Sequence, residues 1–138
     1  MQIFLPYSSP YLTAISLDKR RLHKQIIECK QIIKAICGVS NAWKNHPICN
    51  MYKNDIEWLI YYTSCLDFFN KGYLSYAKLM SEIAIEIQPK FINEAYCDNF
   101  KKRLYTKDKN KYQCFKSYGE SYENWYYINN NWKIYKQK

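Results

Sequence analysis

"SLDKRRLHKQIIECKQIIKA", residues 16–35, decides the fold class, because its apolar residues recur at helical spacing. They continue to residue 36 at intervals of four, three, four and three, and they are Leu22, Ile26, Cys29, Ile33 and Ile36. This spacing is typical of a helix face packed on a core. The other face carries polar side chains, namely Arg21, Lys24, Gln25, Glu28 and Gln31. A single acid on a basic face therefore needs an explanation.

The ends of this helix follow from its flanking residues. Ser16 or Asp18 can cap the start, and Gly38 is suited to the end. Before it, "MQIFLPYSSPY" at residues 1–11 contains two prolines, so we expect an extended segment on the surface or across the core.

Further helices are predicted by apolar periodicity and by glycine and proline breaks. Asn54 and Glu57 resemble a capping box at the start of a nearly all-apolar helix, which we expect at the centre of the domain. Residues 38–53 are predicted to form a loop. The helices are expected over residues 54–72, 75–87 and 93–106. The aromatic tail after residue 116 is expected to pack on the body as irregular chain or short strands.

The composition favours one compact all-α domain over residues 1–138, a helical bundle with an extended N-terminus and an irregular aromatic C-terminal tail. Hydrophobic residues make up 48% of the 138 residues, and three glycines and four prolines are too few for a turn-rich β-fold. The longest apolar run, residues 56–69, is too short for a membrane span, and no signal peptide is recognisable. We therefore expect an intracellular protein, in the cytoplasm, nucleus or nucleoid, with no membrane partner.

The six cysteines form no CxxC pair, and only two histidines accompany them. We expect reduced thiols, no metal and no cofactor.

The net charge of +9 is unevenly distributed. Residues 1–53 carry eight Lys/Arg and two acids, residues 54–97 three and six, and residues 98–138 ten and four. Clustered positive charge is typical of proteins that bind polyanions. Generic solubilisation by lysine in an Asn- and Ile-rich chain is the competing interpretation.

Common catalytic motifs such as a P-loop, GxGxxG, HExxH or GxSxG are absent from the sequence. Lys24 and Glu28 stand four residues apart, which by itself indicates a routine surface ion pair. Alternatively, the cations hold a DNA backbone while the Glu28 carboxylate faces a sugar and moves protons.

Four segments carry a resemblance to a known family. They read MQIFLPY at residues 1–7, LDKRRLHKQIIE at 17–28, AWKNHPICNMY at 42–52 and LYTKDKNKY at 104–112. They resemble the pyrimidine-dimer DNA glycosylase (endonuclease V) family, in particular a bacterial and viral branch with MQTFLPY, LDxxRLxKQxxE, GWxNHPxxxMW and LxxKDxxxY patterns. The tail "ENWYYINNNWKIY" is similar to the aromatic C-terminus of phage members.

The resemblance implies a DNA repair enzyme, monomeric and possessing both glycosylase and abasic-site (AP) lyase activity, that acts on pyrimidine-dimer-type lesions in duplex DNA. In the family an N-terminal α-amine forms a Schiff base with the sugar, so the nucleophile here would be the amine of Met1. Glu28 would be the essential acid. Contacts to DNA or substrate are predicted for Arg20, Arg21, Lys24, Gln25, His46, Lys101 and Lys102.

This sequence departs from the family pattern at several positions. Gln2 follows Met1 where phage members carry a small residue, so we expect Met1 to be retained; if it were removed, Gln2 could cyclise and lose its amine. Ile27 and Gln31 replace arginines, and Phe100 replaces a histidine. A non-catalytic nucleic-acid-binding protein is the alternative function, and a structural or host-interacting protein is a third.

Overall fold

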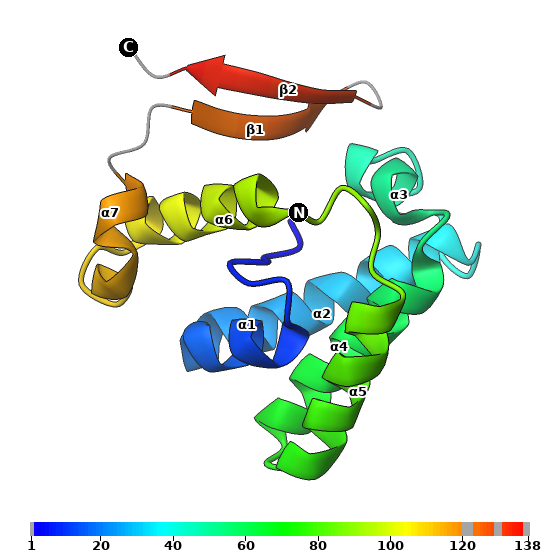
Figure 1. Ribbon diagram of the computed structural model, residues 1–138. Helices are drawn as coiled ribbons and strands as arrows, with labels where there is room; N and C mark the ends of the chain where they lie inside the picture. Colours follow the sequence, from blue (N-terminus) through cyan, green and yellow to red (C-terminus); the bar gives the residue numbers. More distant parts are fainter. Residues whose placement is uncertain (1, 120–122, 129–130, 137–138) are drawn as a thin grey trace.

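The computed structural model describes residues 2–119, 123–128 and 131–136, and helices dominate it (Figure 1). This confirms the all-α expectation for the body of the protein. The helices are α1 (Pro10–Ser16), α2 (Lys19–Ile36), α3 (Pro47–Tyr52), α4 (Ile56–Asn70), α5 (Leu74–Glu86), α6 (Glu94–Lys107), the 3-10 helix η1 (Gln113–Phe115) and α7 (Lys116–Gly119). Two antiparallel strands follow, β1 (Glu123–Ile128) and β2 (Asn131–Lys136).

Helix α2 begins and ends where its flanking residues predict. The Asp18 carboxylate accepts a hydrogen bond from the Arg21 backbone N–H at 3.4 Å, and Gly38 beyond the helix has a φ of 76°. That left-handed conformation suits glycine, which has no Cβ to clash with the backbone. The predicted face is partly wrong: Gln25, expected among the polar residues, is only 1% exposed, and Ile32 is buried more deeply than Ile33.

Helix α4 is the buried centre, as its all-round apolar sequence predicts. It packs against α1, α2 and α5, and its buried residues include Trp58, Leu59 and Tyr62. The predicted capping box is wrong, because Asp55 is the N-cap residue and makes no side-chain capping bond. Glu57 is therefore one position too early in the helix to complete such a box.

Two short helices contradict the prediction that their segments are non-helical. Helix α1 starts at Pro10 after Ser9, and α3 starts at Pro47 after His46. Proline is well tolerated at the first position of a helix, where its missing N–H would have no helical partner. The preceding residues 2–5 are non-helical, as expected, and cross the core with Ile3 and Leu5 at most 1% exposed.

The later helices agree with the periodicity, since α5 stops before Pro89 and α6 begins after the capping residue Asn93. Of the two alternatives for the tail, short strands are the one observed: β1 pairs with β2 and contacts α3 and α6. All six cysteines are free thiols, and those that are buried are Cys29, Cys49, Cys65 and Cys97.

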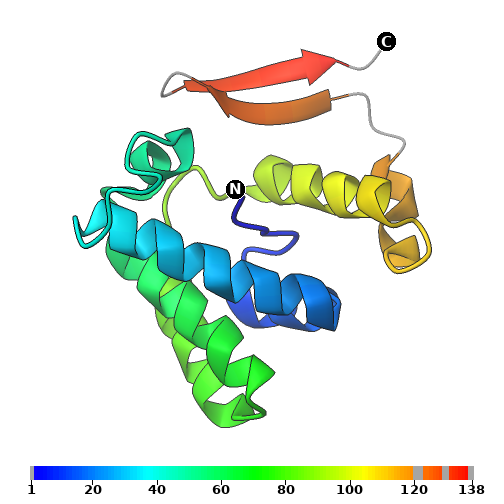
Figure 2. The ribbon, with the colours of Figure 1, turned by 180° about the vertical axis from the view of Figure 1, so that it is seen from behind.

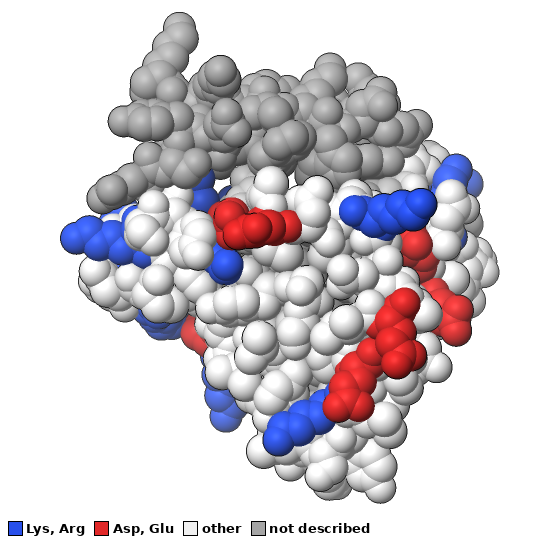
Figure 3. Space-filling model, viewed as in Figure 1, with Lys and Arg blue, Asp and Glu red and all other residues white. Residues whose placement is uncertain are grey.

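Helices α5 and α2 lie on opposite sides of α4. Helix α5 is in front in Figure 1, whereas α2 comes to the front when the molecule is seen from behind in Figure 2. On the α5 side, acidic side chains form a row (Figure 3), and α5 contributes the exposed Glu82 and Glu86. The basic face of α2 is thus separated from an acidic face by the core. Within the described part of the chain, none of the helices combines the length and hydropathy that crossing a membrane requires.

Candidate active site

A pocket of about 390 Å³ lies between the N-terminal segment, helix α2 and the chain that leaves α6. Its walls are rich in charge, with five cations and two carboxylates. The lining residues are Gln2, Phe4, Arg20, Arg21, Lys24, Gln25, Glu28, Lys107, Asp108 and Lys111. The structure thus brings together five residues that the sequence analysis selected, from Arg20 to Glu28.

The α2 wall of the pocket follows from helical spacing. Lys24 and Glu28 are four residues apart, and the Lys24 Nζ lies 4.0 Å from the Glu28 Oε1. The Lys24 side chain is 75% exposed, whereas that of Glu28 is 20% exposed. The lysine side chain therefore lies mostly in solvent, whereas the carboxylate lies against the pocket wall.

Gln25 fastens the N-terminal segment to this wall. Its side-chain oxygen accepts a hydrogen bond from the Phe4 backbone N–H at 2.6 Å, and its amide nitrogen donates to the Gln2 carbonyl oxygen at 2.9 Å. The Tyr62 hydroxyl donates to the Phe4 carbonyl oxygen at 2.5 Å. Residues 2–4 are consequently held by side chains of α2 and α4. The direct substrate contact predicted for Gln25 stays a prediction beside this observed positioning role.

The segment that Gln25 holds begins with Gln2, which is the first residue that the structure describes. The predicted nucleophile, Met1, lies outside the described residues. The Gln2 side-chain oxygen is buried and has no hydrogen-bond partner among the described residues. An acceptor without a partner among the described residues therefore lies beside the pocket.

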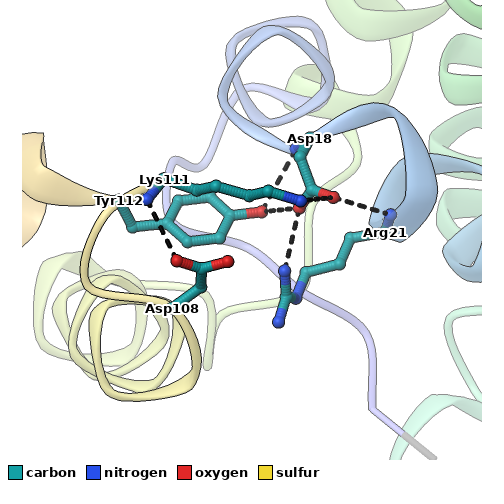
Figure 4. Close-up of polar contacts among 5 residues, drawn as sticks. All are labelled: Asp18, Arg21, Asp108, Lys111 and Tyr112. Carbon is teal, nitrogen blue, oxygen red and sulfur yellow. Dashed lines mark hydrogen bonds and ion pairs between the residues drawn. The ribbon is translucent and has the colours of Figure 1, made fainter.

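Asp18 joins α2 to the chain beyond α6 (Figure 4). Its carboxylate accepts a short hydrogen bond from the Tyr112 hydroxyl, which in turn accepts from the Asp18 backbone N–H at 3.1 Å. The Arg21 guanidinium and the Lys111 ammonium lie 3.1 Å and 3.6 Å from the carboxylate. Two of the pocket's cations are therefore held in place by one acid.

These contacts fix the charge of Asp18. Burial raises the pKa of its carboxyl, but hydrogen bonds from Tyr112 and Arg21 outweigh that effect and lower the pKa to about 2. For Tyr112, burial and the neighbouring carboxylate raise the pKa of the phenol to about 12. At neutral pH the pair is thus an aspartate anion and a neutral phenol.

The second wall of the pocket was not among the predicted site residues. It consists of Lys107, Asp108 and Lys111, all within "LYTKDKNKY". The family-like LxxKDxxxY pattern in this segment could have indicated them: Leu104 and Tyr112 are at most 1% exposed and anchor the segment, and the residues between them reach the pocket.

Asp108 shapes this wall as well as lining it. Its side chain accepts a hydrogen bond from the Lys111 backbone N–H at 3.1 Å, in the turn that follows α6 (Figure 4).

Three predicted contact residues lie elsewhere among the described residues. His46 caps α3: its Nδ1 accepts from the Ile48 backbone N–H at 3.1 Å, and burial lowers its pKa. Lys101 is over the rings of Tyr7 and Tyr118 at 4.8 and 4.6 Å, beside another cavity. Lys102 is 3% exposed, and burial lowers its pKa. Their predicted roles in DNA binding remain predictions.

The residue types around the pocket indicate acid–base and electrostatic chemistry. Within residues 2–119, 123–128 and 131–136 there is no group of three or more His, Cys, Asp or Glu side chains that could hold a metal ion.

A helical protein whose pocket gathers five cations around two carboxylates has the electrostatics of the class that binds phosphate-rich ligands. Comparison with known families is more specific: residues 1–67 match the model of the pyrimidine dimer DNA glycosylase family. The match includes Glu28 and the α2 wall but ends before Lys107. No curated protein and no solved structure matches the chain.

Proposed function

We propose that the protein is a DNA repair enzyme, a DNA glycosylase with AP lyase activity. It acts on pyrimidine-dimer-type lesions in duplex DNA through a Schiff base with the α-amine of Met1. The observation that carries the proposal is the placement of Glu28: a carboxylate stands in a cationic pocket whose wall also holds the first described residues of the chain.

An α-amine suits this chemistry. Its reference pKa of about 7.7–8.0, against about 10.4 for a lysine side chain, leaves a substantial share as free base at neutral pH. Consecutive Cα atoms are about 3.8 Å apart, so holding the Gln2 carbonyl restricts where a preceding amine can be. Gln25 is thereby a positioning residue for the nucleophile.

The proposed reaction proceeds in balanced steps. The amine attacks C1′ of the damaged nucleotide, the glycosidic bond breaks, and the base leaves with its electron pair and a proton. The sugar ring opens to an iminium. A carboxylate then removes a C2′ proton, and the C3′–O bond breaks to release the 3′-phosphate. Water finally hydrolyses the imine and restores the amine. Glu28 is the proposed group for the proton transfers.

Four of the pocket cations, Arg20, Arg21, Lys24 and Lys111, are proposed to bind the phosphates that flank the lesion. Neutralising phosphates releases counterions, so binding of this kind weakens steeply as salt increases. Residues 1–138 are proposed to act as one domain and as a monomer inside the cell.

A second candidate is a non-catalytic DNA-binding protein. It is favoured by the 4.0 Å ion pair between Lys24 and Glu28, since such a pair can be a surface contact of at most about 1 kcal/mol with no catalytic role.

Glu28→Gln separates the two candidates. The variant keeps the size of the side chain and removes its charge, so the enzyme hypothesis predicts that cleavage of a duplex with one abasic site falls at least about 100-fold. DNA affinity at equal salt is expected to stay the same or increase. Glu82→Gln, on the acidic α5 face, is the matched control. If Glu28→Gln still cleaves the duplex at the wild-type rate, Glu28 has no catalytic role and only forms an ion pair with Lys24.

A further inference from the structure

Lys107 shares the pocket with Glu28 but comes from the opposite wall. It is the last residue of α6, and its side chain is exposed. The Lys107 Nζ lies 5.1 Å from the centroid of the Phe4 ring. Because Gln25 holds the Phe4 backbone, this contact places the lysine above the segment that leads to the chain start.

The surroundings of Lys107 favour its neutral form. Partial burial lowers the pKa of its ammonium, and so do the neighbouring cations Arg21, Lys24 and Arg103, while Glu28 opposes them. Like Glu28, the cation–π contact with the Phe4 ring acts in the opposite direction and favours the charged form of Lys107. Among the described residues, no carboxylate lies within ion-pair distance, 4.0 Å, of the Lys107 Nζ. A lysine that only binds phosphate does so in its charged form and needs no lowered pKa. An amine nucleophile attacks in its neutral form, so surroundings that lower its pKa favour this role.

We propose that Lys107 is a second amine nucleophile of this pocket, able to form a Schiff base with C1′ of an abasic deoxyribose. This inference rests on the proposed function. The free amine attacks the aldehyde carbon of the ring-opened sugar, and the carbinolamine loses water to form an iminium. Glu28 accepts the C2′ proton, and the C3′–O bond breaks to release the 3′-phosphate. Hydrolysis of the imine restores the amine.

Borohydride trapping tests the proposal. The full chain is mixed with a duplex that contains one abasic site, reduced, digested and mapped by mass spectrometry. The expected adduct is on the peptide with Lys107, alone or together with one on the Met1 peptide. Lys107→Arg keeps the positive charge but supplies no nucleophile at accessible pH, so the yield of adduct on the peptide that contains position 107 should fall at least about tenfold with DNA affinity unchanged. Lys109→Arg, two residues away and not among the pocket's lining residues, is the matched control.

The outcomes separate the two proposals. An adduct on the Met1 peptide alone, with the same yield in Lys107→Arg, overturns the role of Lys107 and leaves the proposed function intact. No adduct on any peptide overturns both. A loss of adduct in Lys107→Arg that only parallels a loss of DNA affinity would mean that Lys107 anchors phosphate, and this also overturns the proposal.

Discussion

Gln25→Leu is the substitution that most directly tests how the pocket is built. Leucine has nearly the volume of glutamine and suits a side chain that is 1% exposed, so packing is largely preserved. Both hydrogen bonds to the N-terminal segment are lost, those to the Phe4 N–H and the Gln2 carbonyl. The substitution therefore isolates the polar contribution of one buried amide.

The magnitude follows from these two bonds. A buried donor left without a partner costs about 1–3 kcal/mol, and the second bond adds about 1 kcal/mol. The greater hydrophobicity of leucine offsets part of the loss from these two hydrogen bonds. We therefore expect the free energy of unfolding to fall by about 2–3 kcal/mol. For a domain with a stability of about 5–15 kcal/mol this is a large change. It corresponds to a decrease in Tm of roughly 10 °C.

Urea unfolding at pH 7 measures this loss, and the proposed cleavage of an abasic-site duplex measures its functional consequence. Since residues 2–4 would no longer be fixed to α2, strand cleavage should decrease more than DNA affinity does. Gln31→Leu, at an exposed position of the same helix, is the control and should change stability by less than about 0.5 kcal/mol. Equal unfolding midpoints for Gln25→Leu and wild type would refute the positioning role.

Two further predictions concern titratable groups. The pKa of Asp18, about 2 against an ordinary 3.8, means that its contacts stabilise the fold above pH 4 and are lost as the pH falls towards 2. Tyr112→Phe should raise that pKa and lower the free energy of unfolding at pH 7 by about 1–2 kcal/mol. Urea midpoints measured from pH 7 to 2.5 should then fall less steeply with decreasing pH than those of the wild type. The same pH dependence in both proteins would contradict this account. Cys37 and Cys114, the exposed thiols, should react quickly with a thiol reagent in the native protein, and all six cysteines should react after denaturation. Fast native labelling of Cys29, whose pKa burial raises to about 12, would contradict the buried arrangement.

Local sequence information was sufficient for much of the fold. The Asp18 cap, the apolar repeat of α2 and the glycine after it all act within a few residues, so the helix and its cationic face could be predicted. The short helices that start at Pro10 and Pro47 are not predictable in this way, because proline more often interrupts a helix than starts one. In both helices it occupies the first position, where it costs no hydrogen bond.

The burial of Gln25 could not be predicted in the same way. A glutamine next to apolar residues in a helix is normally placed on the solvent face, and nothing within a few residues contradicts that. Its partners, the backbones of Gln2 and Phe4, are more than 20 residues away in sequence. Only the tertiary fold shows that two backbone groups of an extended segment need an amide from α2.

The two walls of the pocket form one structural unit, although they come from distant segments of the chain. Asp18 starts α2 and, through Tyr112, binds the chain that carries Lys107 and Lys111. The first pattern supplies the acid and the second supplies the phenol that binds it. The family model matches residues 1–67, which contain only the α2 wall and the N-terminal segment. A complete pocket therefore requires the second half of the chain to pack against the first, and the Asp18–Tyr112 hydrogen bonds join the two halves beside the pocket.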